Sequence, residues 1–511
     1  MTEKIAIIVL IFYAIIRYKK ALHMFQQNRY NDKNRYLVWL KKNILKSFNI
    51  IELLPIIIYL VIEEYFIFSM LVIYIFLIIS ELISKEKTKI PLAITARVKR
   101  LIITSVIIFA LPILLLSNYL YVVYILLIFG MFKIVIFANI INKPIEKLVF
   151  TYYRKKAIKK LDDLKHLIKI GITGSYGKTS SKLILTSILN QKYNAMTTPE
   201  NYNTPNGLML TINNYMDKFS DYFVAEMGAC RVGEIKELTD MIKPHHGILT
   251  KIGVAHLETF KTQENIQKTK FELIESLPKD GIAVLNKDDK YQVEYNLKNN
   301  CNVVWIGIDN KGDYVASNIE YSNNGMKFDV SYKKEKHSFT TKLLGKSNVY
   351  NILGAVALAH QLDTSFYIMQ KAISRINAPT HRLELKKLNN MTIIDDAYNS
   401  NPVGSKMALD VLSKMPGYRI IVTPGMIDLG EEENFYNKEF GKHMKDNVDF
   451  VILVGKKQTE AIFSGLEEVN FDKKNISVVP NLNEAFLKIS EINEKNKFVL
   501  LENDLPDIFN E

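Results

Sequence analysis

The chain has 511 residues, of which 48% are hydrophobic and 23% are charged, which is ordinary for a globular protein of several domains. Two cysteines, Cys230 and Cys301, exclude a disulfide framework and a cysteine-rich metal site. The formal net charge of +13 is uneven, because residues 1–150 carry 19 Lys and Arg against 8 Asp and Glu, and the remaining residues carry 47 against 45. Since the basic excess lies beside apolar runs, it indicates a membrane face and no nucleic-acid partner.

Five hydrophobic runs in residues 1–150 predict an α-helical transmembrane module of about five spans. The runs cover residues 5–16, 50–62, 65–80, 101–116 and 119–141. A bilayer needs roughly 20 apolar residues, so most runs reach this length only with their flanks. A cleaved signal peptide is the alternative for the first run, but a basic loop follows it without a small-residue cleavage site.

The loops between these runs predict an orientation. Residues 17–48 and 84–100 are rich in Lys and Arg, whereas the turns at Glu63 and Asn118 have neither. The positive-inside rule then predicts a multi-pass protein of the plasma membrane, with everything after Asn142 in the cytoplasm. Membrane lipids are therefore expected partners. Lys133, inside the last run, is either a proton-relay residue or, as we favour, a lysine that snorkels or faces a neighbouring helix.

A phosphate-binding loop is predicted shortly after residue 165, where β-branched runs begin to alternate with helical stretches. A predicted strand at 167–172 leads into TGSYGKTS (173–180) and then into a predicted helix at 181–190. Glycines let backbone N–H groups approach phosphate, and the helix N-terminus adds positive potential. Lys178 would contact the outer phosphates, and Thr179 would bind Mg²⁺. Ile172 stands where a complete loop of this class has its first glycine.

The predicted nucleotide-binding residues of this loop are Gly174, Ser175, Gly177, Lys178, Thr179 and Ser180. Downstream, Glu226 and His256 each follow a predicted strand, where doubly wound sheets place their ligand sites. Taken singly, His256 is also consistent with a loop histidine, and Lys270 with a solvated lysine on a helix face.

The order of these segments resembles the Mur ligase family, the ATP-dependent amide-bond formers of peptidoglycan synthesis, and their folylpolyglutamate relatives. The resemblance implies ATP and Mg²⁺ as cofactors, with Lys270 carbamylated. The implied metal ligands are Thr179, Glu226, His256 and Lys270, and the implied catalytic residues are Lys178, His256, Lys270 and Arg382.

Further nucleotide contacts are implied by the same resemblance. Segment 281–289 is similar to the stretch that holds the adenine end of ATP, and segment 345–351 is similar to a family motif in which Ser347 replaces the usual histidine. Arg382 would reach the γ-phosphate, with a linker salt bridge as the structural alternative. The stretch 395–402 is close to a motif of the family branch that adds D-alanyl-D-alanine. These segments contribute Asn286, Asp289, Asn348, Asn351, Arg382 and Asp396.

The predicted organisation is a transmembrane module at 1–150, a P-loop-type central ATPase domain with a parallel sheet at 165–378, and a Rossmann-like C-terminal domain at 379–511. The family's N-terminal uridine-nucleotide domain is missing, and its place is taken by the predicted spans. Segments 423–430 and 501–506 also depart from the family pattern. The resemblance over residues 165–511 therefore concerns ATP and the metal above all, the amine donor much less, and the carboxylate acceptor scarcely at all.

The leading hypothesis is an ATP-dependent amide ligase of cell-envelope synthesis that acts through an acyl phosphate. The amine donor would be an amino acid or a dipeptide, and the acceptor a carboxylate on a nucleotide-linked or lipid-linked precursor. A polyglutamate-synthase-like or capsule-polymer ligase is the first alternative. An ATP-driven transporter or signalling NTPase is the second, and it leaves His256, Lys270 and Asp396 without a role.

Overall fold

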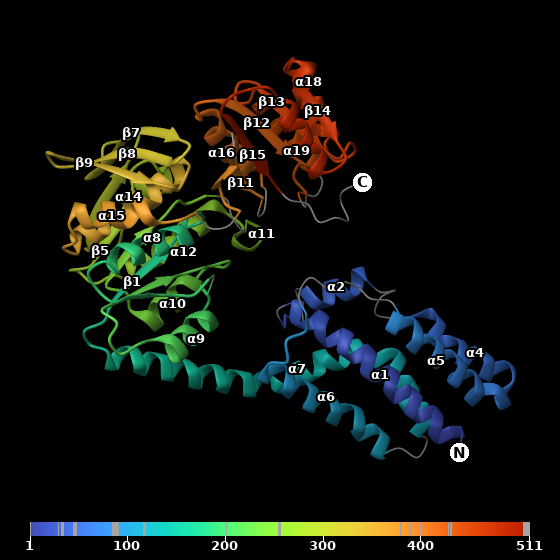
Figure 1. Ribbon diagram of the computed structural model, residues 1–511. Coiled ribbons are helices and arrows are strands. Elements are labelled where there is room, and N and C mark those ends of the chain that lie inside the picture. Colours follow the sequence, from blue (N-terminus) through green and yellow to red (C-terminus); the bar gives the residue numbers. More distant parts are fainter. Residues whose placement is uncertain are drawn as a thin grey trace. The chain divides into compact units, whose positions relative to one another are not determined.

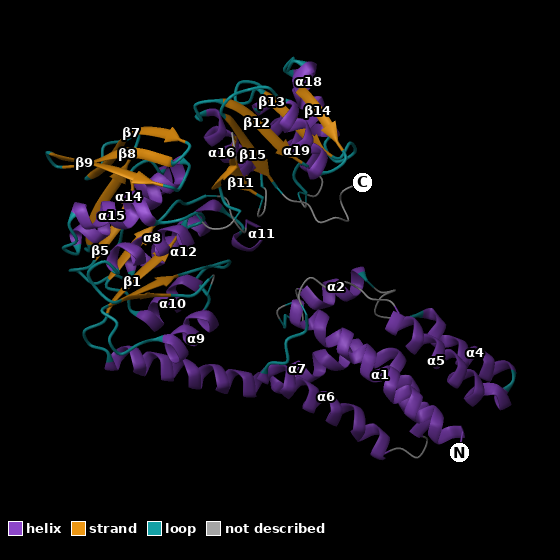
Figure 2. Ribbon diagram, in the orientation of Figure 1, coloured by secondary structure: helices purple, strands orange, loops and turns teal. Residues whose placement is uncertain are grey.

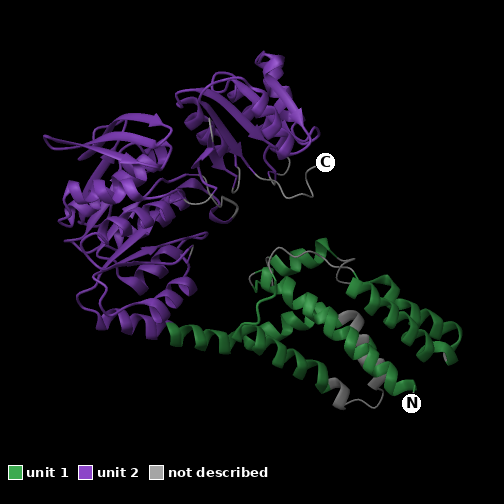
Figure 3. Cartoon of the chain, in the orientation of Figure 1, with its two compact units in different colours: residues 1–153 green, residues 154–511 purple. Residues whose placement is uncertain are grey.

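The computed structural model describes the chain apart from a set of short segments. These are residues 1, 29, 32–34, 44–48, 84–90, 116–118, 201, 254–256, 379–380, 389–390, 398–400, 428, 430–431 and 504–511. Contacts divide the chain into two compact units, residues 1–153 and 154–511 (Figure 3). The boundary falls inside the long helix α7 (Tyr119–Asp163).

The first unit is helical wherever it has described secondary structure (Figure 2). Its elements besides α7 are α1 (Thr2–Gln27), α2 (Leu37–Lys42), η2 (Ile50–Leu53), α4 (Leu54–Val61), η3 (Glu63–Tyr65), α5 (Phe66–Ile83) and α6 (Ala96–Leu115). Its interior is partly polar. Arg17 is buried and donates to Glu81 Oε1 (3.2 Å), and Tyr13 donates to the buried Glu52 (2.8 Å). Charged groups in the core of this unit are thus paired inside the protein.

The prediction of five membrane spans is not supported by these helices. Among the described residues, α5 is the one helix that is long and apolar enough to cross a membrane, with 18 residues and a mean hydropathy of 2.6. The second predicted run forms η2 followed directly by α4, a short apolar helical stretch over Ile50–Val61 that extends about 20 Å. This is shorter than a hydrocarbon core of about 30 Å. A single such helix is weak evidence for a membrane protein.

The second unit contains a large sheet, shown in green and yellow in Figure 1. In the described chain it has nine strands in the order β2-β3-β1-β4-β5-β6-β7-β8-β9, parallel from β2 to β7 and antiparallel from there on. The strands are β1 (Ile168–Thr173), β2 (Ala195–Thr197), β3 (Tyr222–Glu226), β4 (His246–Leu249), β5 (Ile282–Asn286), β6 (Asn302–Gly307), β7 (Tyr314–Ser322), β8 (Gly325–Tyr332) and β9 (Glu335–Thr341). The predicted parallel sheet is therefore present.

Helices cover both faces of this sheet. Neighbouring residues of a strand point to opposite faces. Gly247 of β4 lies against Leu273, whereas Ile248 lies against Gly354. Leu273 belongs to α12 and Gly354 to α14, so these two helices cover opposite faces. The helices of this part are α8 (Lys178–Leu189), α9 (Pro205–Tyr215), α10 (Glu234–Ile242), α11 (Leu257–Phe260), α12 (Gln263–Glu275), α13 (Lys290–Val293), α14 (Lys346–Gln361) and α15 (Phe366–Arg375).

A second sheet follows, with the order β10-β11-β15-β12-β13-β14. Only β10 is antiparallel, and β15 inserts between β11 and β12. The strands are β10 (Glu384–Leu388), β11 (Met391–Asp396), β12 (Tyr418–Thr423), β13 (Phe450–Val454), β14 (Ile476–Val479) and β15 (Lys497–Glu502), and the helical elements are α16 (Pro402–Ser413), α17 (Glu433–His443), α18 (Glu460–Glu468), η5 (Lys473–Asn475) and α19 (Leu482–Glu491). This alternation forms a Rossmann-like sheet.

Candidate nucleotide and metal site

The glycine loop joins β1 to α8 and closes around the ammonium group of Lys178. Lys178 Nζ donates hydrogen bonds to the carbonyl oxygens of Gly174 (2.8 Å) and Ser175 (3.1 Å). Gly177 has a φ of +82°, a left-handed conformation that favours glycine, and it caps α8. The helix therefore begins at Lys178, three residues earlier than predicted. Burial lowers the pKa of Lys178, and the nearby Glu226 carboxylate opposes this shift.

The segment after β4 supports the glycine loop. Ser175 Oγ donates to the carbonyl of Gly253 (2.8 Å) and accepts from its N–H (3.0 Å). The N–H of Ser175 donates to the carbonyl of Lys251 (2.7 Å). A methyl group added to Gly174 would lie 1.9 Å from Thr250 Oγ1, so this position requires glycine. Ser175, a predicted nucleotide contact, is thus also used to shape the loop.

The two residues predicted at the adenine end, Asn286 and Asp289, lie at and just beyond the end of β5. Both are buried. Asp289 accepts hydrogen bonds from the N–H groups of Ile252 (2.7 Å) and Tyr291 (3.1 Å), and from Gln292 Nε2 (3.1 Å). Asn286 Oδ1 accepts from the N–H of Asp288 (2.9 Å). These side chains fix the loop after β5 to the segment after β4, and nucleotide contact by either remains a prediction.

Asn351 and Asn348 connect α14 to the glycine loop. Asn351 Oδ1 accepts from Ser181 Oγ (3.1 Å), and Asn351 Nδ2 donates to Asn348 Oδ1 (3.2 Å). A methyl group added to Gly177 would lie 2.4 Å from Asn351 Oδ1. The structure thus brings Asn351 to the loop and Asn348 beside Asn351, and contact of either with the nucleotide stays a prediction. Ser180 is half-buried on the first turn of α8.

Glu226 ends β3 and is 1% exposed. Its Oε1 accepts a hydrogen bond from Asn203 Nδ2 (2.9 Å). Its Oε2 lies 2.9 Å from Lys182 Nζ in an ion pair, but accepts no hydrogen bond within the described structure. A buried carboxylate oxygen that lacks a hydrogen bond is a suitable ligand for Mg²⁺, which prefers oxygen ligands. Glu226 therefore fits the predicted metal site.

Lys270 is buried on α12, with its Nζ 5.9 Å from the centre of the Phe260 ring. Burial, together with the nearby Lys178 ammonium, lowers the pKa of Lys270 to about 7. Two lysines therefore share this site, and near neutral pH a large fraction of Lys270 is an uncharged amine, in contrast to an ordinary lysine. The structure brings Lys178, Glu226 and Lys270 together at the carboxyl end of the parallel strands.

The other two predicted metal ligands are His256 and Thr179. His256 lies outside the described residues. Among those that are described, no group of three or more His, Cys, Asp and Glu side chains is placed to hold a metal ion. Thr179 is half-buried on the first turn of α8. Among the described residues, the predicted ligands besides Glu226 are therefore the hydroxyl group of Thr179 and Lys270, which can bind a metal ion only after conversion to a carbamate.

The remaining predicted residues lie around β10 and β11. Arg382 is exposed, and the residues on both sides of it have left-handed backbones, with φ of +57° at His381 and +51° at Leu383. Asp396 accepts from the N–H of Leu383 (3.1 Å), and burial and the neighbouring Asp395 raise its pKa to about 6 although Arg382 opposes this. Asp395 pairs with His381 (2.8 Å). Asp396 thus fixes the backbone that presents Arg382.

Comparison with known proteins identifies the architecture. The model of the Mur ligase middle domain matches residues 172–359, and that of the Mur ligase, glutamate ligase domain matches residues 381–502. The UDP-N-acetylmuramoyl-tripeptide–D-alanyl-D-alanine ligase of Escherichia coli (strain K12) is 31% identical over 310 residues, which are 60% of this chain and 68% of that protein. The chain belongs to the Mur ligase family.

Further proteins of the Mur ligase family are similar to this chain in sequence or in fold. The enzyme of the same name from Bacillus subtilis (strain 168) is 29% identical over 337 residues, covering 65% of this chain and 72% of that protein. The crystal structure of the MurF ligase from Thermotoga maritima in complex with ADP matches with a TM-score of 0.59 and 24% identity, over 69% of this chain and 80% of that one. A MurF structure from Acinetobacter baumannii matches with a TM-score of 0.59, 24% identity, and coverage of 69% and 77%. These solved structures share the fold.

Membership of the Mur ligase family establishes the class of activity. The chain is an ATP-dependent ligase that joins a carboxylic acid to an amine in peptidoglycan precursor synthesis, and it uses ATP and Mg²⁺. The predicted cofactors and enzyme class are therefore confirmed. The predicted location in the plasma membrane as a multi-pass protein is wrong, because the relatives are MurF-type ligases and the described chain has only one candidate helix.

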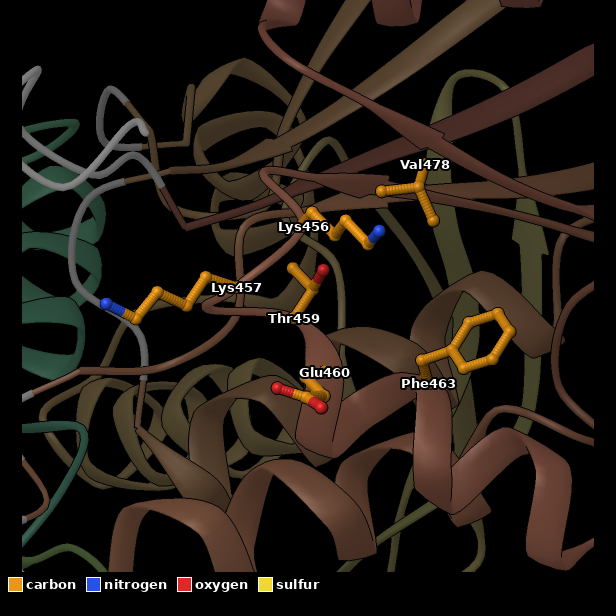
Figure 4. Close-up of a pocket in the computed structure, with 6 residues that line it drawn as sticks. All are labelled: Lys456, Lys457, Thr459, Glu460, Phe463 and Val478. Atoms are coloured by element: carbon orange, nitrogen blue, oxygen red, sulfur yellow. The ribbon is translucent and has the colours of Figure 1, made fainter.

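A cavity of about 510 Å³ lies elsewhere in this Mur ligase, beside β13, β14 and the start of α18 (Figure 4). Lys456 and Lys457 extend in opposite directions beside it, and the Phe463 ring forms part of its wall. Its other lining residues are Thr459, Glu460 and Val478. None of the predicted site residues lines the cavity, so the nucleotide hypothesis rests on the glycine loop.

Sequence analysis missed two residues of the site. Lys182 and Asn203 both contact the carboxylate of Glu226. A signal for Lys182 was present, because it shares a helix face with Leu185 and Leu189, both fully buried. A lysine on the apolar face of a helix usually has a specific partner.

Proposed function

We propose that this Mur ligase joins a D-alanyl-D-alanine-type dipeptide to the terminal carboxylate of a peptidoglycan peptide precursor. The grouping of the half-buried Lys178 with the buried Glu226 and Lys270 beside the glycine loop carries the proposal, because it suits phosphoryl transfer from ATP. The relatives named above support the dipeptide as the amine donor. The stretch 395–402, which resembles the corresponding motif, supports it as well.

Each part of the site has a separate proposed role in the reaction. Lys178 would neutralise charge on the transferring phosphoryl group, while its bonds to the loop carbonyls keep its ammonium in position. The acceptor carboxylate would attack the γ-phosphorus of ATP, forming an acyl phosphate and releasing ADP. The donor amine would then attack the acyl carbon and displace phosphate. Arg382 would stabilise phosphate charge, and the C-terminal sheet would help to exclude water.

Thr179, Glu226, His256 and the carbamate of Lys270 would hold Mg²⁺, which supplies positive charge to the phosphate oxygens. We propose Lys270 as a carbamate because an ammonium here would add to the charge of Lys178, whereas a carbamate supplies anionic oxygens. The glycine-loop residues would contact the phosphates. Asn286, Asp289, Asn348, Asn351 and Asp396 would hold the nucleotide by direct contact or through the loops that they fix.

We propose the domain division of the sequence analysis, with residues 165–378 for nucleotide and metal and residues 379–511 for the amine donor. The family models begin at residue 172, so the helical unit at 1–153 is matched by neither. The acceptor therefore has two candidate forms, a soluble uridine-linked peptide or a lipid-linked or polymeric carboxylate.

The test combines purified protein, ATP and Mg²⁺ with each acceptor form, and with and without the dipeptide. Phosphate release that requires both acceptor and dipeptide, with the amide product seen by mass spectrometry, is the expected result. Phosphate release that needs neither would refute a ligase reaction. Glutamate in place of the dipeptide examines the polyglutamate alternative, and extracted envelope lipids examine the lipid-linked acceptor. Lys178→Met is the inactive control.

A further inference from the structure

Lys182 is a fully buried lysine within the metal site, with 0% of its surface exposed. It lies on α8 one turn after Lys178. Its Nζ donates to the carbonyl oxygens of Thr198 (3.0 Å) and Glu200, and forms the ion pair of 2.9 Å with Glu226 Oε2. A buried ammonium group is costly unless it is paired, and here two carbonyl oxygens accept its hydrogen bonds while the Glu226 carboxylate balances its charge.

The other contacts of Glu226 come from the segment that Lys182 holds. The N–H of Glu226 donates to Thr198 Oγ1 (3.3 Å), and Asn203 Nδ2 donates to Glu226 Oε1 (2.9 Å). The carbonyl of Asn203 accepts from the N–H of Gly228 (2.8 Å), where a methyl group would lie 2.7 Å from the Asn203 side chain. The two ends of segment 198–203 are therefore both attached to Glu226 or its strand.

The strained backbone of Glu200 also supports a role for Lys182 in holding this segment. Glu200 has a φ of +38°, which is unfavourable for a residue with a side chain. In this conformation its carbonyl oxygen accepts a hydrogen bond from Lys182. The bond to a buried ammonium therefore helps to stabilise this unfavourable conformation of Glu200.

We propose that Lys182 is a positioning residue for the metal site, which holds the Glu226 carboxylate in place and joins it to Thr198 and Glu200. The inference rests on the proposed role of Glu226 as a magnesium ligand. A carboxylate has about four lone-pair sites, so one ammonium and one amide leave room for a metal ion. Lys182 compensates the buried charge of Glu226 before the metal binds.

A purely structural role is the competing explanation, in which Lys182 only satisfies two carbonyl groups. Lys497 provides a matched example, because it is 4% exposed and donates to the carbonyls of Ile489 (3.1 Å) and Ile492 (2.9 Å). No ion pair of Lys497 is present in the described structure. Lys497→Met therefore removes a buried lysine that compensates no carboxylate.

The experiment measures thermal unfolding of the full-length protein with ADP, either in EDTA or in Mg²⁺. The variants are Lys182→Met, Lys497→Met, Glu226→Gln and the double variant Lys182→Met/Glu226→Gln. Lys182→Met leaves a buried carboxylate without its cation, so it is expected to lower the Tm in EDTA by roughly 10 °C. Mg²⁺ then supplies the missing charge, and should raise the Tm of Lys182→Met more than that of the wild type.

The controls separate this inference from the proposed function. Lys497→Met should lower the Tm equally in EDTA and in Mg²⁺. Glu226→Gln should abolish the Mg²⁺-dependent rise, and if it does not, the proposed metal role of Glu226 fails. If Glu226→Gln abolishes the rise but Lys182→Met behaves like Lys497→Met, the role of Lys182 is overturned and the proposed function stands.

The double variant covers the case in which Lys182→Met does not fold. It removes both charges, so it should be more stable in EDTA than Lys182→Met. A double variant that folds when Lys182→Met does not would support the pairing. A double variant that is as unstable as Lys182→Met, or that also fails to fold, would overturn it.

Discussion

Replacing Lys270 by arginine is expected to abolish ligation, because arginine keeps a positive charge but cannot form a carbamate. Carbon dioxide adds to the neutral amine, whose nitrogen forms the new N–C bond and then loses a proton to solvent. The yield of carbamate therefore depends on the fraction of Lys270 that is uncharged. Burial and the Lys178 ammonium lower the pKa of Lys270 from 10.5 to about 7.

This pKa sets the size of the effect. At pH 7.5 a pKa of about 7 leaves roughly three quarters of Lys270 neutral, whereas an ordinary lysine is roughly 0.1% neutral. The reactive fraction is thus several hundred times larger. Carbamate, and with it activity, should be lost as the pH falls below about 7.

The same shift affects stability. The folded protein binds this proton more weakly than the unfolded chain, so the stability present above pH 10.5 decreases as the pH falls towards about 7. The decrease is at most about 5 kcal/mol. In buffer free of carbon dioxide, Lys270→Met should remove this part of the pH dependence.

The assay is ¹³C NMR of the protein in ¹³C-bicarbonate, combined with phosphate release during ligation. A carbamate signal is expected in the wild type and should be absent from Lys270→Arg. Lys268→Arg, at an exposed position on the same helix, is the matched control and should keep both signal and turnover. Wild-type turnover in Lys270→Arg, or a signal that persists in that variant, would falsify the carbamate assignment.

Three further substitutions test other parts of the site. Asp289→Ala removes the acceptor of three hydrogen bonds and should lower the free energy of unfolding by roughly 2–4 kcal/mol in urea titrations; an unchanged stability with a raised KM for ATP would instead indicate direct nucleotide contact. Gly177→Ala combines a left-handed backbone, worth about 1–2 kcal/mol, with a clash against Asn351, and should weaken ADP binding in calorimetry. Gly233→Ala has a similar φ of +86° but open space, so equal loss of ADP binding there would contradict the clash. Arg382→Ala should lower kcat roughly 100-fold or more at saturating ATP; a kcat within a few-fold of the wild type would show that it does not act on phosphate.

The glycine loop could be predicted from the sequence because its signal is local. Gly174, Gly177 and Lys178 lie within five residues, and the flanking strand and helix follow from hydrophobic periodicity. The contacts of Lys182 with Glu226 join positions 44 residues apart in the chain, and no local pattern reports them. Such a pairing depends on sheet order, in which β3 lies directly beside β1.

In the helical unit at residues 1–153, the sequence predicts a feature, the membrane spans, that the structure does not support. Long apolar runs predict spans, although the structure ends one of them as a short helical stretch, Ile50–Val61, and buries charged residues such as Arg17 within the bundle. Hydropathy measures only the average character of a segment. It does not show where a helix ends, or that Arg17 finds carboxylate partners inside the protein.

The chain of bonds from the glycine loop to Asp289 places part of its constraint on the main chain. Ser175 and Asp289 act through their side chains, but Ile252 contributes only its backbone N–H, which donates to Asp289. Every amino acid except proline carries that donor. Related sequences can therefore vary the side chain of Ile252 within the space available and still keep this bond. Conservation of residue identity would underestimate how strongly position 252 is constrained, and the rarity of proline there would be the better indicator.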